Sequence, residues 1–345
     1  MEEEYGILEN TVRDFSAKFI ENNALKIENE GINETLIRSL AEQGFLSMAY
    51  QQGVGKAIDM KAFALILENL AKTSPSVAVK VLLTNLFLTL ATEESILNEV
   101  SSGSKSGTVV LSELLGGYSP KERLAINGNR IQGKKEFVVD SDASFIITLV
   151  DSGELVLLKS GFSKDAKHKR LGFRGLDFST ISVNSDNFDV IAKNGLVELR
   201  NAYSRMAIPI AAIAIGIAEG SISKAVEYAK VRMAFNHYLK DFQPIAFNLS
   251  SNLAELSMLK QYLSYIVGLE KNSTEALFLK TRSMEAAKEI SKNALQTHGG
   301  YGYLEDFGVE KFYRDSMALS ILFYNEEKEM EQLSEYVFDS KAGFV

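Results

Sequence analysis

The chain has 345 residues, of which 46% are hydrophobic and 24% charged, so it can form several packed layers around a large core. Its formal net charge of -8 argues against a sequence-independent grip on nucleic acid. The absence of cysteine excludes disulfides and thiolate metal sites, and the three histidines are widely spaced, so no metal site is predicted. The acidic N-terminus lacks an apolar signal core, and we expect a cytoplasmic protein.

Residues 1–105 are predicted to form an N-terminal helical domain. Apolar residues recur there at helical spacing, and Asn33 is a candidate N-cap for one of the helices. Two further helices are expected over 61–70 and 76–90. Pro75 separates them, because proline fits the first turn of a helix but not its interior.

Residues 106–192 are predicted to form a middle β domain. Short runs of β-branched and apolar residues alternate there with glycines. The strand-like runs are 107–112, 137–139, 145–150 and 155–159. We expect a compact barrel or sandwich between two helical domains.

Residues 193–345 are predicted to form a C-terminal helical domain, which makes the fold class α+β and mostly α. The long helices are expected over 202–231, 253–266, 274–294 and 312–323. The longest apolar run, 206–218, is too short at 1.5 Å per residue to cross a bilayer of about 30 Å. We therefore expect a buried helix and no membrane insertion.

The segment 296–315, QTHGGYGYLEDFGVEKFYRD, combines a glycine-rich turn with a charged helical stretch. Gly299, Gly300 and Gly302 would let backbone N–H groups approach an anion or a flat ring without interference from a Cβ atom. The same glycines could also serve as an ordinary helix C-cap.

This segment resembles the C-terminal signature of the acyl-CoA dehydrogenase family of flavoproteins. The positions that fit the family pattern in register are Gln296, Gly299, Gly300, Gly302, Tyr303, Glu305, Val309, Glu310, Lys311, Arg314 and Asp315. The resemblance implies three domains ending in a four-helix bundle and FAD as the cofactor. It also implies a role in fatty acid metabolism and assembly into a dimer or a homotetramer.

A second segment, RMAFNHYLKDFQ at 232–243, resembles the family motif R-x-x-F-G-x-x-L-x-x-x-Q, with Asn236 in place of glycine. In the family these residues reach the pyrophosphate and adenine of FAD across a subunit interface, as suits an arginine that pairs with phosphate oxygens. Taken alone, the segment could equally be a solvated helix end. The FAD contacts that the resemblance implies are Arg232, Phe235, Gln243, Gln296, Gly299, Gly300, Ser112 and Phe137.

The middle domain follows the family pattern less closely. Ser112 stands where the family has a threonine, and Tyr118 replaces a serine. Phe137 could cover one face of the flavin or could belong to the core of the domain. Val139 lacks the hydroxyl that would reach the ring.

The family uses a glutamate to remove the α proton of a thioester while hydride leaves the β carbon for the flavin. Phe323 occupies the usual glutamate position, where its backbone N–H could still polarise a bound carbonyl, and no carboxylate lies beside Arg205, the other family location. The remaining candidates are Glu326 and Glu327, and a local shift of three residues in the turn would make Glu326 the base. Alternatively, Glu326 belongs to the exposed acidic first turn of a last helix, where negative charge is favourable.

The resemblance thus predicts a FAD-dependent oxidoreductase that desaturates an acyl-CoA, with an electron-transfer flavoprotein as a candidate electron acceptor. Two other interpretations stay open. The chain could be a catalytically silent partner subunit of a mixed flavoprotein oligomer, or a flavin oxidase or monooxygenase on the same scaffold. Fold alone does not choose among them.

Overall fold

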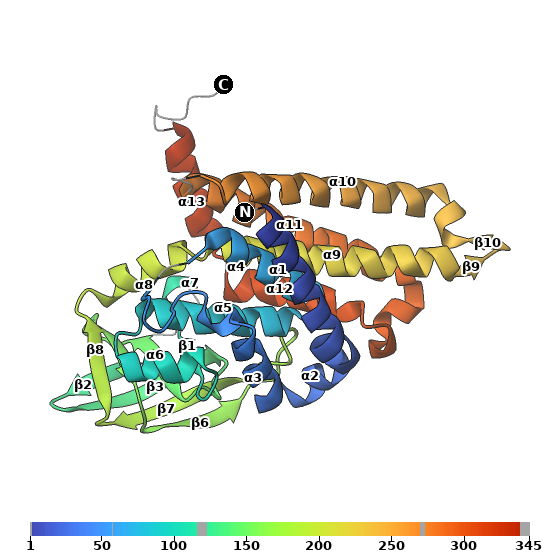
Figure 1. Cartoon of the computed structure of the whole chain (residues 1–345). Helices are drawn as coiled ribbons and strands as arrows, with labels where there is room; N and C mark the ends of the chain where they lie inside the picture. The colour runs from blue at the N-terminus through green and yellow to red at the C-terminus, as the bar shows by residue number, and fades with distance from the viewer. Residues whose placement is uncertain (1, 57, 116–122, 270–272, 339–345) are drawn as a thin grey trace.

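The computed structural model describes residues 2–56, 58–115, 123–269 and 273–338, and it runs from helices to strands to helices (Figure 1). The N-terminal helices are α1 (Glu2–Phe15), α2 (Ala24–Glu30), α3 (Glu34–Glu42), α4 (Met60–Ala71), α5 (Pro75–Leu90) and α6 (Glu94–Ser101). Asn33 caps α3, because its side-chain oxygen accepts a hydrogen bond of 2.9 Å from the Leu36 N–H. Pro75 begins α5, whose residues are almost all buried, as predicted.

The middle region contains two sheets that enclose a core of their own. Its elements are β1 (Gly107–Val109), α7 (Ser112–Leu115), β2 (Leu124–Asn127), β3 (Arg130–Val139), β4 (Phe145–Leu149), β5 (Leu155–Leu158), β6 (Phe162–Lys167), β7 (Phe178–Ser185) and β8 (Phe188–Ala192). Among the described residues, the sheets have the strand orders β1-β4-β5-β8 and β2-β3-β7-β6. Buried side chains from both sheets, including Ile146 and Ile181, form one apolar cluster. The predicted β region between helical regions is confirmed.

The C-terminal region is a bundle that contains three long helices, α9, α10 and α11 (Figure 1). Its elements are α8 (Gly195–Ser204), α9 (Ala207–Val231), β9 (Met233–Ala234), β10 (His237–Tyr238), α10 (Gln243–Ile266), α11 (Ser273–His298), α12 (Glu310–Leu322) and α13 (Glu326–Phe338). Helix α9 packs on α4, α10, α11 and α12. Gly216 of α9 allows the close contact with α4, since a Cβ atom there would lie 2.3 Å from the Glu68 carbonyl oxygen.

The helix predicted over 202–231 is interrupted. Helix α8 ends at Ser204, and α9 begins at Ala207. Pro209 explains the break, because it has no N–H to donate to the Arg205 carbonyl and its ring crowds that carbonyl. Helix α9 is long and apolar enough to cross a membrane, but 83% of its most apolar window is buried inside the protein.

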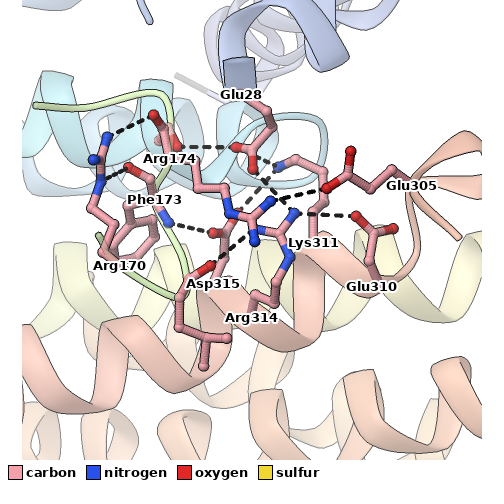
Figure 2. Close-up of polar contacts among 11 residues, drawn as sticks. Glu28, Arg170, Phe173, Arg174, Glu305, Glu310, Lys311, Arg314 and Asp315 are labelled. Atoms are coloured by element: carbon pink, nitrogen blue, oxygen red, sulfur yellow. Dashed lines mark hydrogen bonds and ion pairs between the residues drawn. The ribbon is translucent and has the colours of Figure 1, made fainter. Parts of the chain in front are cut away.

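A buried ionic network joins the three regions (Figure 2). Glu28 of α2 lies 3.2 Å from Arg314 of α12, and Arg314 also donates to the Leu171 carbonyl in the loop between β6 and β7. Lys311 pairs with Asp315 at 3.1 Å. The other oxygen of Asp315 accepts the Phe173 N–H at 2.6 Å. Helices α2 and α12 and this loop are therefore held together by charges removed from water.

Replacing Asp315 by alanine is expected to lower the free energy of unfolding by about 3–5 kcal/mol, because it leaves the buried Lys311 ammonium and the Phe173 N–H without their acceptor. Chemical denaturation measures this change. Glu30→Ala is the control, since Glu30 pairs with Lys26 at the surface and its loss should cost less than about 1 kcal/mol. Equal losses in the two variants would contradict the role given to the network.

Candidate functional site

A cavity of about 430 Å³ lies where the end of α9 meets the end of α11 and the 3-10 turn Gly299–Tyr303 that follows it. We call it the glycine-turn cavity. Its lining residues are Tyr228, Arg232, Leu239, Gln296, Thr297, His298, Gly299, Gly300, Tyr301 and Leu304. Half of the predicted cofactor residues, Arg232, Gln296, Gly299 and Gly300, thus meet in one place although they come from two separate segments.

Arg232 ends α9, and its backbone N–H donates to the Tyr228 carbonyl. The guanidinium carbon lies 5.0 Å from the centre of the Tyr301 ring, a cation–π contact. A guanidinium that contacts a ring keeps its five N–H donors, which can bind an anion. An arginine held in this way suits a phosphate group.

The three glycines of the turn have different reasons to be glycine. Gly299 has a φ of +57°, and a Cβ atom on Gly302 would lie 2.6 Å from the Leu295 carbonyl oxygen. At Gly300 a Cβ atom would meet no atom within 4 Å among the described residues. The backbone conformation therefore explains Gly299 and close packing explains Gly302, but neither explains Gly300. Its bare backbone is open to a ligand or to a second chain.

His298 forms part of the same wall. Its ring stacks on Tyr228, with centroids 4.3 Å apart and planes 20° apart, and its Nδ1 lies 2.8 Å from the Ala294 carbonyl oxygen. Nδ1 therefore donates this hydrogen bond. Burial lowers the pKa of His298, so the imidazole is neutral at neutral pH.

Two predicted cofactor residues lie near this end of the bundle but do not line the cavity. Phe235 and Asn236 form the tip of the β9–β10 hairpin, with φ values of +50° and +62° that suit the asparagine. Phe235 is 90% exposed. Gln243 is the first residue of α10 and is also exposed. Within the described part of the chain, no hydrogen bond, ion pair or ring contact of the Phe235 or Gln243 side chain explains its position.

Ser112 and its neighbours lie elsewhere, at the start of α7. The Ser112 hydroxyl donates to Glu113, and Glu113 pairs with Lys135 of β3. The hydroxyl is thus engaged within the chain. Tyr118 lies outside the described residues.

Phe137 is not a core residue of the β region. Its φ is +56°, at an irregularity of the β3–β7 pairing, and the residue is 44% exposed. A bulky side chain in this conformation is strained, by about 1–3 kcal/mol. Its ring packs against the rings of His168 and Phe178, with centroids 5.2 Å and 5.9 Å away. An aromatic face is therefore presented at the surface, where a flat ligand could stack.

Position 323, at which the family usually carries its base, is buried and not open to a ligand. The Phe323 side chain is 1% exposed and belongs to the main hydrophobic core. Its N–H donates to the Leu319 carbonyl and its carbonyl accepts the Tyr203 hydroxyl at 2.6 Å, so the N–H that was expected to polarise a substrate carbonyl is already used. Glu326 is exposed in the first turn of α13 and lines none of the cavities described here. Its placement fits the alternative interpretation, an acidic helix start.

A larger cavity of about 720 Å³ lies among α4, α7, α8, the start of α9, α11 and α13; we call it the Lys280 cavity. Its lining residues are Met60, Leu114, Leu115, Arg200, Tyr203, Ser204, Arg205, Ala207, Ile208, Ala276, Leu277, Lys280, Asn325, Lys328, Glu329, Glu331, Gln332 and Glu335. Lys280 is 2% exposed and pairs with Glu329 at 2.5 Å. Burial raises the pKa of Glu329 and lowers that of Lys280, and each partner's charge opposes the shift.

The Lys280–Glu329 pair was not predicted from the sequence. Lys280 does carry a signal, because it falls on the same helical stripe as the buried Ala276 and Ala287. Glu329 carries none, since it is one of several acids in the run at 326–331, and only the packing of α13 shows which of them points inward.

The chain is similar to known proteins over nearly its whole length. Residues 2–95 match the family model "Acyl-CoA dehydrogenase, N-terminal domain", and residues 194–337 match "Acyl-CoA dehydrogenase, C-terminal domain". The 3-(aryl)acrylate reductase of Clostridium sporogenes is 26% identical, with 96% of this chain and 97% of that protein covered. The caffeyl-CoA reductase-Etf complex subunit CarC of Acetobacterium woodii is also 26% identical, with the same coverage. Butyryl-CoA dehydrogenase of Megasphaera elsdenii has the same fold, with a TM-score of 0.83 at 20% identity over 96% of this chain and 97% of that one.

The depressed pKa of His298 has a measurable consequence. As the pH falls from about 7 to about 5, the unfolded chain takes up a proton at this residue before the folded protein does, so the residue's contribution to stability is lost. His298→Phe keeps a flat ring against Tyr228 but cannot titrate. As the pH falls over that range, the free energy of unfolding of the wild type should therefore decrease more than that of this variant. Urea unfolding at each pH measures the difference. A difference that does not depend on pH would contradict the buried, neutral state of the ring.

Proposed function

Because this chain belongs to the acyl-CoA dehydrogenase family, we propose that it is a FAD-dependent oxidoreductase that acts on the Cα–Cβ bond of an acyl-CoA thioester. The observation that carries the proposal is the glycine-turn cavity, in which Arg232, Gln296 and Gly300 meet. The two relatives reported above are named as reductases, so the direction of the reaction in the cell is not part of the proposal.

The residues present fit the nucleotide end of FAD. Arg232 offers donors to phosphate oxygens, and the open backbone at Gly300 allows close approach of a ligand. Tyr301 and His298 add ring surfaces to the same wall. For the flavin ring, the exposed face of Phe137 is the candidate contact. When bound, FAD would supply the acceptor for a hydride.

The Lys280 cavity is the candidate site for the thioester. Arg200, Arg205 and Lys328 carry positive charge on its wall, which suits the phosphates of coenzyme A. Ala207, Ile208, Ala276 and Leu277 supply an apolar surface for an acyl chain. A volume of about 720 Å³ lies within the range of small-molecule sites.

Assembly with a second copy would complete the nucleotide site. Large apolar side chains are exposed in the segments that bound the glycine-turn cavity: Val231 is 72% exposed, Phe235 90% and Tyr303 87%. Exposed apolar surface of this kind is typical of a surface that another chain covers. We propose a homodimer or homotetramer, with an electron-transfer flavoprotein as the redox partner.

The absorption spectrum of the purified protein tests the reaction class. We expect flavin absorbance in the visible range, and its bleaching under anaerobic conditions when a saturated acyl-CoA is added. A protein that consumes oxygen without a thioester would instead be a flavin oxidase or monooxygenase. A colourless protein that gains flavin only beside a sister chain would be a silent partner, and either outcome would overturn the proposal.

Arg232→Ala should weaken FAD binding about 10- to 100-fold, because hydrogen bonds from a charged donor to phosphate contribute about 1.5–3 kcal/mol. Titration of the apoprotein with FAD, followed by flavin fluorescence, gives the dissociation constant. Arg38→Ala is the matched control, since Arg38 lies on α3 and pairs only weakly with Glu34 at the surface. Unchanged affinity in Arg232→Ala would remove the arginine from the nucleotide site.

A further inference from the structure

Three polar side chains from three helices meet in the wall of the Lys280 cavity. They are Tyr203 of α8, Lys280 of α11 and Glu329 of α13. The Lys280 ammonium lies 2.5 Å from Glu329 Oε1 and 3.2 Å from the Tyr203 hydroxyl oxygen. Lys280 is 2% exposed and Glu329 7%, so the group is largely shielded from bulk water.

This cluster adjoins the place at which the family carries its base. The Tyr203 hydroxyl donates to the carbonyl oxygen of Phe323 at 2.6 Å. One hydrogen bond thus separates the cluster from residue 323, whose own side chain is in the core. The nearest buried carboxylate on the cavity wall is then Glu329, six residues further along the chain.

Glu329 also has an unused oxygen. Lys280 occupies Oε1, and the backbone N–H of Glu329 is fixed by the Asn325 carbonyl, but the buried Oε2 accepts no hydrogen bond from any described residue. A buried acceptor without a donor costs free energy and is uncommon in folded proteins. Glu329 is one of the residues that line a ligand-sized cavity, and an unpaired oxygen on such a residue has the character of a functional group rather than of a structural one.

We propose that Glu329 replaces the missing base: its free oxygen accepts the proton from the α carbon (C2) of a thioester bound in the Lys280 cavity. This inference rests on the proposed function. The C2–H bond breaks, the proton goes to Glu329 Oε2, and the electron pair left on C2 delocalises onto the thioester carbonyl oxygen. Lys280 is the positioning residue, because it holds the carboxylate through Oε1 and its charge opposes the rise in the pKa of Glu329 that burial causes.

The alternative is an ion pair that only fastens α13 to α11. The two roles differ in what removal of both charges does. Replacing a buried ion pair by apolar side chains is often neutral for stability, so Lys280→Met combined with Glu329→Leu should keep the fold. A structural pair would then leave proton transfer intact, whereas a base would not.

The test is exchange of the C2 protons of a 3-thia-acyl-CoA in D₂O, followed by proton NMR with the FAD-loaded protein. This probe has no hydrogen on atom 3, so it reports proton abstraction without hydride transfer. We expect exchange with the wild type and a loss of at least about 100-fold in Glu329→Gln and in the double variant, since a positioned base contributes about 10²- to 10⁴-fold. Visible absorbance and thioester binding should be retained in both.

Glu327→Gln is the matched control, because Glu327 lies exposed on the same helix and outside the cavity. It should exchange at the wild-type rate. If Glu329→Gln fails to fold, the double variant decides. Wild-type rates in the variants, an equal loss in Glu327→Gln, or a flavin-loaded wild type that does not exchange C2 protons would overturn the assignment of Glu329 alone. A wild type that binds no FAD would overturn the proposed function, and the assignment would fall with it.

Discussion

The rest of the structure depends on the buried charges around Arg314 and Asp315. Arg314 of α12 contacts Glu28 from the N-terminal helices and the Leu171 carbonyl from the β region. Asp315 of α12 accepts the Phe173 N–H, which also belongs to the β region. Charges so far from water are tolerable only when each is paired, so the three regions must take one arrangement to satisfy all of them. That arrangement fixes the position of α12. Helix α13 follows α12 after a short turn, and Asn325 and residues of α13 form one side of the Lys280 cavity.

The segment 296–315 serves two purposes, and its sequence does not separate them. Its first part, Gln296 to Tyr301, lines a cavity, whereas Lys311, Arg314 and Asp315 join the three regions and line no part of that cavity. Both parts match one family pattern. The match was therefore a sound guide to the fold and to the family, but it did not show which of the matched residues face a ligand.

The sequence predicted those features of the fold that a residue and its near neighbours in the chain determine, such as the ends of helices. Asn33 is a helix cap and Pro75 a helix start because each has the same effect in any protein. The break before α9 was missed, although Pro209 was its cause. The sequence named Glu326 and could not show that Glu329 is the buried acid, because both lie in one acidic run and only the docking of α13 buries one of them. Phe137 was also undecidable, since its exposure follows from a positive φ at an irregular strand pairing.

The two cavities lie at opposite ends of α11, and this separation bears on how a complete site is formed. Lys280 and Gln296 stand sixteen residues apart on this helix, which at 1.5 Å per residue is about 24 Å. The glycine-turn cavity is open at the end of the bundle, beside the exposed Phe235, whereas the wall of the Lys280 cavity has residues from α4, α7, α8, α9, α11 and α13. The resemblance to the family implies that residues such as Arg232 and Gln296, which line the glycine-turn cavity, contact the FAD of a neighbouring subunit. We propose that the chain offers nucleotide contacts at one end and a thioester cavity at the other, and that it shares both with a second copy. The unexplained glycine at position 300 is where we expect the two chains to meet through the cofactor.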